Sequence, residues 1–270
     1  MPLVFAAITP HPPVLIPALS KDKLSQNISG TVKSCPKTKK AFLLLEQELY
    51  ASKPDTLIII SPHGPMMKDA FVINHSPVLK TDFSEFGDLD TKAEYKNDLA
   101  LGYQLKESLE SSMPLVLNSE EKIDYGSGIP LWYLTSHLKN LLVIPMSFSL
   151  LSRDNHLSLG RAIRKIAETS SKRIAIIASA DLSHRLKKSS PDGYSPEGKI
   201  FDQKVVNCLK EKNIESFKEL SSELLESSGQ CGYQSILVLL GALEEINFKT
   251  NILSYDDSVG VGYLVANLEI

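Results

Sequence analysis

Cysteine is scarce in this chain of 270 residues. There are three, Cys35, Cys208 and Cys231, and no two of them have CxxC spacing. An odd number without paired spacing argues against a disulfide framework and against a structural zinc knuckle, and it fits a reducing, cytoplasmic compartment.

Excess charge of one sign is also lacking, because 29 Lys and Arg stand against 32 Asp and Glu, a formal net charge of −3. We therefore expect neither nucleic acid nor an anionic membrane surface as a partner.

No apolar run is long enough to span a bilayer. The start of the chain, MPLVFAAITPHPPVLIP, is apolar, but prolines interrupt it and no basic segment precedes it. We expect a strand there rather than an export signal or a membrane anchor. Several common catalytic motifs are missing too: the phosphate-binding P-loop, the serine-hydrolase GxSxG, the zinc-protease HExxH and the dinucleotide-binding GxGxxG between a strand and a helix.

The sequence has the composition of an ordinary globular protein, with 43% hydrophobic and 23% charged residues. Runs rich in Val, Ile and Leu without clean alternation are typical of strands buried on both faces of a mainly parallel sheet, and they occupy residues 3–9, 56–61, 141–148 and 173–179. Segments with helical spacing occupy residues 38–51, 91–110, 158–169, 199–210, 214–225 and 233–246. This alternation predicts an α/β fold, a three-layer α/β/α sandwich around a central, mostly parallel (mixed) sheet. The length fits one domain over residues 1–270.

Other segments do not fit this alternation. Residues 249–255 and 260–268 flank an Asp-Asp-Ser turn and are expected to add antiparallel strands at an edge. Residues 78–90 and 185–198 carry turn formers and no period, so we expect loops. The second of these follows a histidine directly and is a candidate lid.

Histidines follow two of the expected strands in the same local context. Thr-Pro-His ends the first strand with His11, and Ser-Pro-His ends the second with His63. Ligands of open α/β sheets bind beyond the carboxyl ends of strands, and proline carries each strand straight into its turn. We therefore expect both imidazoles to face one crevice.

A third histidine, His184, follows the strand at 173–179 in the sequence Ser-Ala-Asp-Leu-Ser-His. One histidine at a strand end is more often bonded to a backbone carbonyl than to a metal, but three at one sheet edge favour a metal ligand set, an acid–base group or both. The remaining histidines, His75, His137 and His156, share no such context and are expected at the surface or in packing.

Cys231 precedes the most apolar helical segment. The dipole and free amides of a helix N-terminus favour a thiolate, which makes Cys231 a candidate soft ligand or nucleophile. The alternative is a small buried apolar residue, the role we expect for Cys35 and Cys208. Asp124-Tyr125-Gly126-Ser127-Gly128 opens a helix or turn before the third strand.

Together these segments resemble the class III extradiol ring-cleavage dioxygenases, represented by the protocatechuate 4,5-dioxygenase β subunit, and the related Memo proteins. The matching pieces are ITPHPPVLIP, LIIISPHGP, DYGSGIPLWYL, SADLSH and CGYQSILVLLGAL, in this order over nearly the whole chain. In those dioxygenases two histidines and a glutamate hold Fe(II), which keeps open positions for the two oxygens of a catechol and for O2. The resemblance implies that His11 and His63 are metal ligands, that His184 is the acid–base histidine and that Asp181 orients it.

Two positions depart from the dioxygenase pattern. Tyr125 stands where the dioxygenases have a histidine, and a phenol is a poor base at neutral pH although it can donate a hydrogen bond. Cys231 stands where the glutamate ligand is expected, as in Memo proteins. A thiolate shifts metal preference towards Zn or Cu without excluding iron.

Three hypotheses follow. The first is a non-haem, Fe(II)-dependent extradiol dioxygenase that acts on a catechol-type small aromatic substrate, with His11, His63 and Cys231 around the metal. The second is a Memo-like metal-binding protein that opens no ring. The third is a hydrolase that uses Cys231 with His184, although no oxyanion-binding element is evident. Assembly into a homo-oligomer is compatible with all three.

Overall fold

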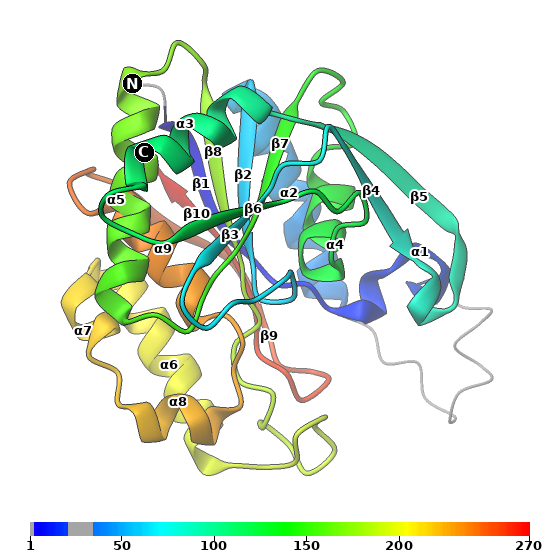
Figure 1. The fold of residues 1–270 in the computed structure, drawn as a ribbon. Helices are drawn as coiled ribbons and strands as arrows, with labels where there is room; N and C mark the ends of the chain where they lie inside the picture. Colours follow the sequence, from blue (N-terminus) through cyan, green and yellow to red (C-terminus); the bar gives the residue numbers. More distant parts are fainter. Residues whose placement is uncertain (1–2, 21–34) are drawn as a thin grey trace.

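A mixed ten-stranded sheet forms the centre of the computed structural model, which describes residues 3–20 and 35–270 (Figure 1). Its main strand order is β4-β5-β7-β2-β8-β1-β10-β9, and β3 and β6 extend it beside β7. The strands are β1 (Leu3–Thr9), β2 (Thr56–Ser61), β3 (Phe71–Asn74), β4 (Val78–Phe83), β5 (Asp88–Asn97), β6 (Leu115–Asn118), β7 (Leu142–Ser147), β8 (Ile174–Ser179), β9 (Lys249–Asp256) and β10 (Tyr263–Glu269). The central strands β5, β7, β2, β8 and β1 run parallel, while β10, β9 and β4 pair antiparallel at the two sides.

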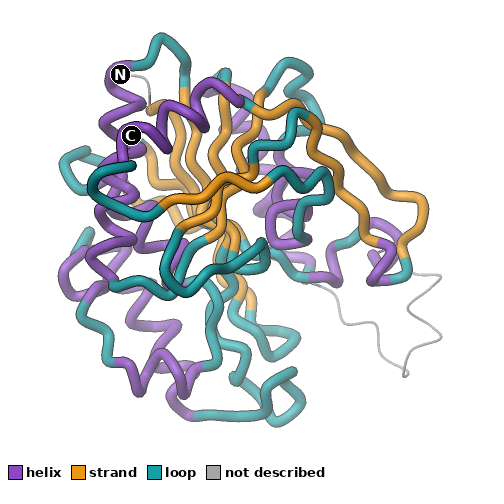
Figure 2. The backbone as a smooth tube through the Cα atoms, in the orientation of Figure 1, coloured by secondary structure: helices purple, strands orange, loops and turns teal. Residues whose placement is uncertain are grey.

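Helices cover both faces of the sheet (Figures 1 and 2). They are α1 (Pro17–Ser20), α2 (Pro36–Ser52), α3 (Leu99–Leu109), α4 (Tyr125–Leu134), α5 (Arg153–Thr169), α6 (Pro196–Glu211), α7 (Ile214–Lys218), α8 (Ser222–Ser228) and α9 (Tyr233–Leu243). Side chains alternate across β2: Ile58 and Ile60 pack in the core beneath α3, α5, α6 and α9, whereas Leu57 and Ile59 pack in the core beneath α2 and α4. The three-layer α/β/α prediction is confirmed.

The four central strand predictions are confirmed to within one residue at each end. The prediction for residues 78–90 is wrong, because this expected loop forms β4, a 3-10 turn η3 (Ser84–Phe86) and the start of β5. Residues 91–97, expected to begin a helix, continue β5, and α3 begins only at Leu99, where the Asp98 side chain accepts a hydrogen bond from the Leu101 N–H. Pairing with β4 and β7 therefore overrides the helical spacing of this segment.

Smaller differences concern short elements and boundaries. The four-residue strands β3 and β6 were not predicted, and the helix expected at 214–225 is divided into α7 and α8. Gly260 and Gly262, expected inside the last strand, lie in the turn before β10, and Gly260 has a φ of +90° that favours glycine. The loop predicted at residues 185–198 is present over residues 185–195, whereas residues 196–198 begin α6. No helix among the described residues is long and apolar enough to cross a bilayer.

Candidate metal centre

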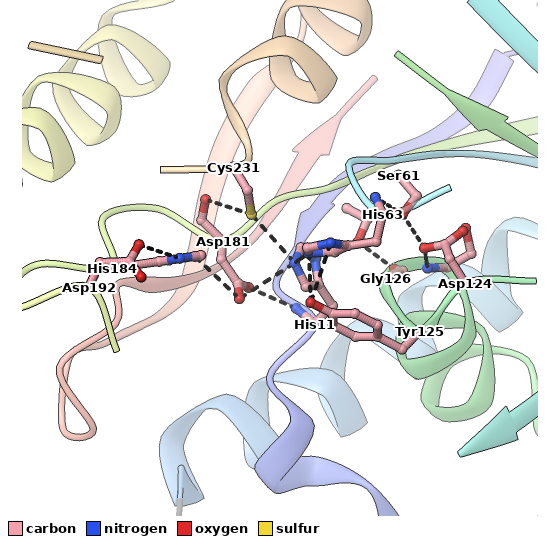
Figure 3. A network of polar contacts seen from close by, with 12 residues as sticks. His11, Ser61, His63, Asp124, Tyr125, Gly126, Asp181, His184, Asp192 and Cys231 are labelled. Atoms are coloured by element: carbon pink, nitrogen blue, oxygen red, sulfur yellow. Dashed lines mark hydrogen bonds and ion pairs between the residues drawn. The ribbon is translucent and has the colours of Figure 1, made fainter. Parts of the chain in front are cut away.

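His11 and His63 meet at the carboxyl edge of the sheet (Figure 3). β1 and β2 both pair in parallel with β8, so the segments that follow these three strands emerge side by side. The Nε2 atoms of His11 and His63 lie 3.1 Å apart, and their rings are nearly perpendicular, at 85°. Two residues 52 positions apart thus direct ring nitrogens at a common point, as the sequence predicts.

Ser179, the last residue of β8, holds the ring of His11. Its hydroxyl donates to the Gly126 carbonyl at 2.5 Å, and its oxygen lies 2.8 Å from His11 Nδ1. Because the single hydroxyl hydrogen is used at Gly126, His11 Nδ1 must be the donor to Ser179. The lone pair of His11 is therefore on Nε2, the nitrogen that faces His63.

Tyr125, the first residue of α4, stacks on the ring of His63 with centroids 4.3 Å apart. Its hydroxyl oxygen is 2.9 Å from His63 Nε2 and 3.3 Å from Nδ1. A hydroxyl that bonded Nε2 within the plane of the His63 ring would lie much farther from Nδ1 than 3.3 Å. The Tyr125 hydroxyl therefore lies over the face of the His63 ring. The in-plane direction of His63 Nε2 stays available to His11 or to a metal.

Asp124 and Ser61 fix the chain around His63. The Asp124 carboxylate accepts hydrogen bonds from the Ser61 hydroxyl and from the Ser127 N–H, which begins α4 beside the end of β2. The Ser61 oxygen in turn accepts the His63 N–H at 3.2 Å. The strand-end serine on β2 therefore supports the histidine that follows it.

Cys231 completes a group of three donor atoms. It lies just before α9, and its Sγ is 3.5 Å from His11 Nε2 and 3.8 Å from the Asp181 carbonyl. Gly232 permits this approach, because a Cβ at that position would lie 2.5 Å from the Cβ of Ala180. The donor atoms of His11, His63 and Cys231 all lie within 4.8 Å of one another.

These distances fit a single metal ion. Two nitrogens bound at about 2.1 Å to one ion, at angles of about 95–110°, lie roughly 3.1–3.4 Å apart. A nitrogen and a thiolate sulfur at about 2.1 and 2.3 Å lie roughly 3.2–3.6 Å apart at the same angles. The observed nitrogen–nitrogen separation of 3.1 Å falls in the first range, and the nitrogen–sulfur separation of 3.5 Å falls in the second. The group is therefore a possible metal-binding site.

The charges in the site are set mainly by burial. Loss of solvent lowers the pKa of His11 well below its usual value, with further lowering from His63 and His184, and burial also lowers the pKa of His63. Neutral imidazoles are the form that binds metals. Burial, followed by the nearby Asp181, raises the pKa of Cys231 well above its usual value. Burial therefore opposes, in the absence of a metal, the thiolate that a helix N-terminus favours.

Asp181 contacts His11 more closely than it contacts His184. Its Oδ1 accepts the His11 N–H at 2.9 Å, while Oδ2 lies 3.5 Å from His11 Nε2 and 4.0 Å from His184 Nε2. Burial raises the pKa of Asp181 to about 7. Asp181, His184 and Cys231 form a second group whose donor atoms lie within 4.8 Å, so the structure brings all six predicted residues to one place.

Sequence reasoning gave no role to Ser179 and Asp124, whose hydrogen bonds fix His11 and the chain around His63, or to Asp192, which lies beside His184. A usable signal for Ser179 was present, because β8 ends in a hydroxyl residue, as β1 and β2 do. Asp192 lies in the loop after β8, with its Oδ2 3.6 Å from His184 Nδ1. Nothing in the local sequence indicates that contact.

The three remaining histidines lie outside this site, as predicted. His156 is buried and its Nδ1 bonds the Ser152 carbonyl, His75 Nε2 bonds the Leu99 carbonyl, and His137 is an exposed partner of Glu46.

A cleft of about 470 Å³ adjoins His63 and Tyr125. Its lining combines apolar and charged side chains, including Val72, Glu85, Lys122 and Met146. This volume is within the range of about 300–1,000 Å³ typical of small-molecule sites.

The family model for the catalytic LigB subunit of aromatic ring-opening dioxygenase matches residues 5–266. Protein CA_C1420 of Clostridium acetobutylicum is 30% identical over 272 residues, which cover 97% of this chain and 56% of that protein. A MEMO1 family protein of Methanococcus vannielii is 28% identical over 117 residues, which cover 43% of this chain and 38% of that protein. The chain thus matches about half, or less, of the length of these curated relatives.

Among solved structures, the crystal structure of uncharacterized protein JW3007 from Escherichia coli K12 matches with a TM-score of 0.68 and 16% identity, covering 98% of this chain and 99% of that one. At this identity the likeness shows the fold alone. The family match rests instead on the sequence and spans all three strand-end histidines. The chain belongs to the LigB family, the family of the catalytic subunit of aromatic ring-opening dioxygenase.

Proposed function

We propose that this protein is a non-haem, Fe(II)-dependent extradiol dioxygenase acting on a catechol-type aromatic diol. One observation carries the proposal: His11 and His63 direct their Nε2 atoms at one point, 3.1 Å apart, with the Cys231 sulfur 3.5 Å from His11. His11, His63 and Cys231 would hold the iron ion, which would supply the open coordination positions that a catechol and O2 need. Both oxygen atoms enter the ring-opened product, so the reaction needs no external reductant.

His184 is the residue that would transfer the catechol proton. Its side chain is about one-fifth exposed, at 22%, and its Nε2 has no hydrogen-bond partner among the described residues. A neutral imidazole there takes a proton from a catechol hydroxyl and returns it as the ring opens. Tyr125 has a different role, because burial raises the pKa of its phenol and keeps it protonated, so it would donate a hydrogen bond to an oxygen of the substrate.

The alternative is a Memo-like metal-binding protein that opens no ring. Cys231 supports it, because a thiolate in place of a carboxylate favours softer metals such as Zn or Cu. Tyr125 supports it as well, because it removes one of the bases that the ring-cleaving relatives are expected to have. The same three ligands hold the metal in either case.

Oxygen uptake tests the two functions. The protein is loaded anaerobically with Fe(II), its metal content is measured, and O2 consumption is followed with catechols that carry neutral, acidic or amino substituents. We expect uptake with at least one of them and a loss of about 100-fold or more in His184→Gln, the usual size of an acid–base contribution. His137→Gln is the matched control, because the same substitution there removes an exposed imidazole outside the site.

The outcomes separate the hypotheses. Full iron occupancy without uptake of O2 on any catechol would contradict ring cleavage and leave the metal-binding role. Metal binding that survives both His11→Ala and His63→Ala would contradict both functions. Comparing Fe, Zn and Cu content after expression without added metal identifies the preferred ion, and Cys231→Ser tests the thiolate as a ligand.

A further inference from the structure

The loop of residues 185–195, between β8 and α6, is fastened to the edge of the site. The Leu186 N–H and the Ser190 hydroxyl both donate to the Gly260 carbonyl, at 3.2 and 2.7 Å. At the far end of the loop, the Ser195 N–H donates to the Arg185 carbonyl at 2.9 Å. These bonds close the loop at its base and place its tip beside the segment that carries His184.

Asp192 lies near the tip of this loop and faces the outer nitrogen of His184 (Figure 3). Its Oδ2 is 3.6 Å from His184 Nδ1, whereas the nearest carboxylate oxygen to His184 Nε2 belongs to Asp181, at 4.0 Å. Asp181 is already engaged with His11, whose N–H it binds at 2.9 Å. The two ring nitrogens of His184 therefore have different surroundings: a carboxylate beside Nδ1 and the metal-binding residues beside Nε2.

We infer that Asp192 is the positioning residue of His184: it holds the ring proton on Nδ1 and leaves the Nε2 lone pair directed at the metal centre. The partner that one ring nitrogen faces sets which nitrogen of a histidine carries the proton, and a carboxylate oxygen 3.6 Å from Nδ1 favours the proton on that nitrogen by electrostatic attraction. A base that serves a substrate at the centre needs that lone pair on Nε2. The catalytic part of this inference rests on the proposed function, whereas the tautomer of His184 does not.

The tautomer is measured by NMR on metal-free protein labelled with 15N at histidine, with His184 assigned from the resonance lost in His184→Gln. We expect the Nδ1–H form in the wild-type protein. Asp192→Asn keeps an acceptor oxygen near Nδ1 and should keep this form. Asp192→Ala removes the acceptor and should shift His184 towards the Nε2–H form. Asp69→Ala, which removes an exposed carboxylate that forms no ion pair within residues 3–20 and 35–270, controls for the lost charge.

An Nε2–H form in the wild-type protein, or an unchanged tautomer in a folded Asp192→Ala protein, overturns the inference. These readouts need no substrate, so they distinguish its failure from failure of the proposed function. Where a catechol consumes O2, Asp192→Ala should lower kcat by about 10–100-fold, the usual effect of losing such a supporting partner, with KM changed less than about twofold. Asp192→Asn should recover most of kcat, and failure of that rescue with an intact Nδ1–H form would refute the positioning role in catalysis.

Discussion

Ser179 offers the sharpest test of the metal centre. Its hydroxyl accepts the His11 Nδ1–H at 2.8 Å and donates to the Gly126 carbonyl at 2.5 Å, and the residue is fully buried. Ser179→Ala leaves one donor and one acceptor buried without partners. Each such group costs about 1–3 kcal/mol, so we expect the free energy of unfolding to fall by about 2–4 kcal/mol after local relaxation.

The larger consequence concerns the metal. Without the bond at Nδ1, the ring of His11 loses its fixed tautomer and its orientation towards His63. Removing the partner behind a metal-binding histidine lowers metal affinity by about 10–100-fold. We expect that loss in Ser179→Ala, measured for Zn(II) and Co(II) by competition with a chelator of known affinity and for Fe(II) under anaerobic conditions.

Ser235→Ala is the matched control, because it makes the same chemical change at another fully buried serine. The Ser235 hydroxyl on α9 has no hydrogen-bond partner among the described residues, so its removal breaks no bond. We expect unchanged metal affinity and a change in stability of less than about 1 kcal/mol. Wild-type metal affinity in a folded Ser179→Ala protein would refute the assignment of His11 Nε2 as a ligand held by Ser179.

Three further predictions concern stability. Burial raises the pKa of Asp202 from its usual value near 3.8 to about 7, so its contribution to stability is complete below about pH 4 and is lost as pH rises through 7. The free energy of unfolding should therefore decrease between pH 4 and pH 8, as measured by urea unfolding, and Asp202→Asn should remove up to about 4 kcal/mol of that decrease. Gly160→Ala would put a Cβ 2.1 Å from the Val238 carbonyl oxygen and should lower the free energy of unfolding by about 1–3 kcal/mol. Gly102→Ala would put a Cβ no closer than 3.6 Å to its neighbours and should raise the free energy of unfolding by about 0.5–1 kcal/mol. Equal thermal midpoints for the two variants would contradict this packing. Metal at 100 times its dissociation constant should raise the unfolding free energy by about 2.7 kcal/mol, and a similar increase in His63→Ala would exclude that residue as a ligand.

The central strands could be predicted because each is buried on both faces. β2 reads Thr-Leu-Ile-Ile-Ile-Ser, and all six residues are buried, so local composition and tertiary environment give the same answer. β5 differs, because most of its residues are exposed or half-buried and its sequence has helical spacing. Its structure is decided by hydrogen bonds to β4 and β7, which no local pattern records.

Some features of the site could also be predicted from the sequence, and others could not. The histidines at strand ends were predictable, because parallel neighbours bring their carboxyl ends together wherever they lie in the sequence. The charge state of Cys231 was not, because the helix N-terminus that favours a thiolate is visible in the sequence, whereas the depth of burial that opposes it is not. The contact of Asp192 with His184 could not be predicted either, because it depends on the hydrogen bonds between residues 185–195 and the turn before β10.

The proposed dioxygenase and the alternative metal-binding protein would share the same three ligands, and the thiolate of Cys231 bears on which metal they prefer. His11, His63 and Cys231 can hold an ion in either case. Among the neighbouring side chains, Tyr125 keeps its proton because burial raises the pKa of its phenol, and Asp181, whose pKa burial raises to about 7, lies closer to His11 than to His184. If the proposed ring opening takes place, His184 would transfer the protons of the catechol, since its Nε2 has no hydrogen-bond partner among the described residues. On this proposal, ring opening would depend on the tautomer of His184, and therefore on the Asp192 carboxylate that lies beside its Nδ1.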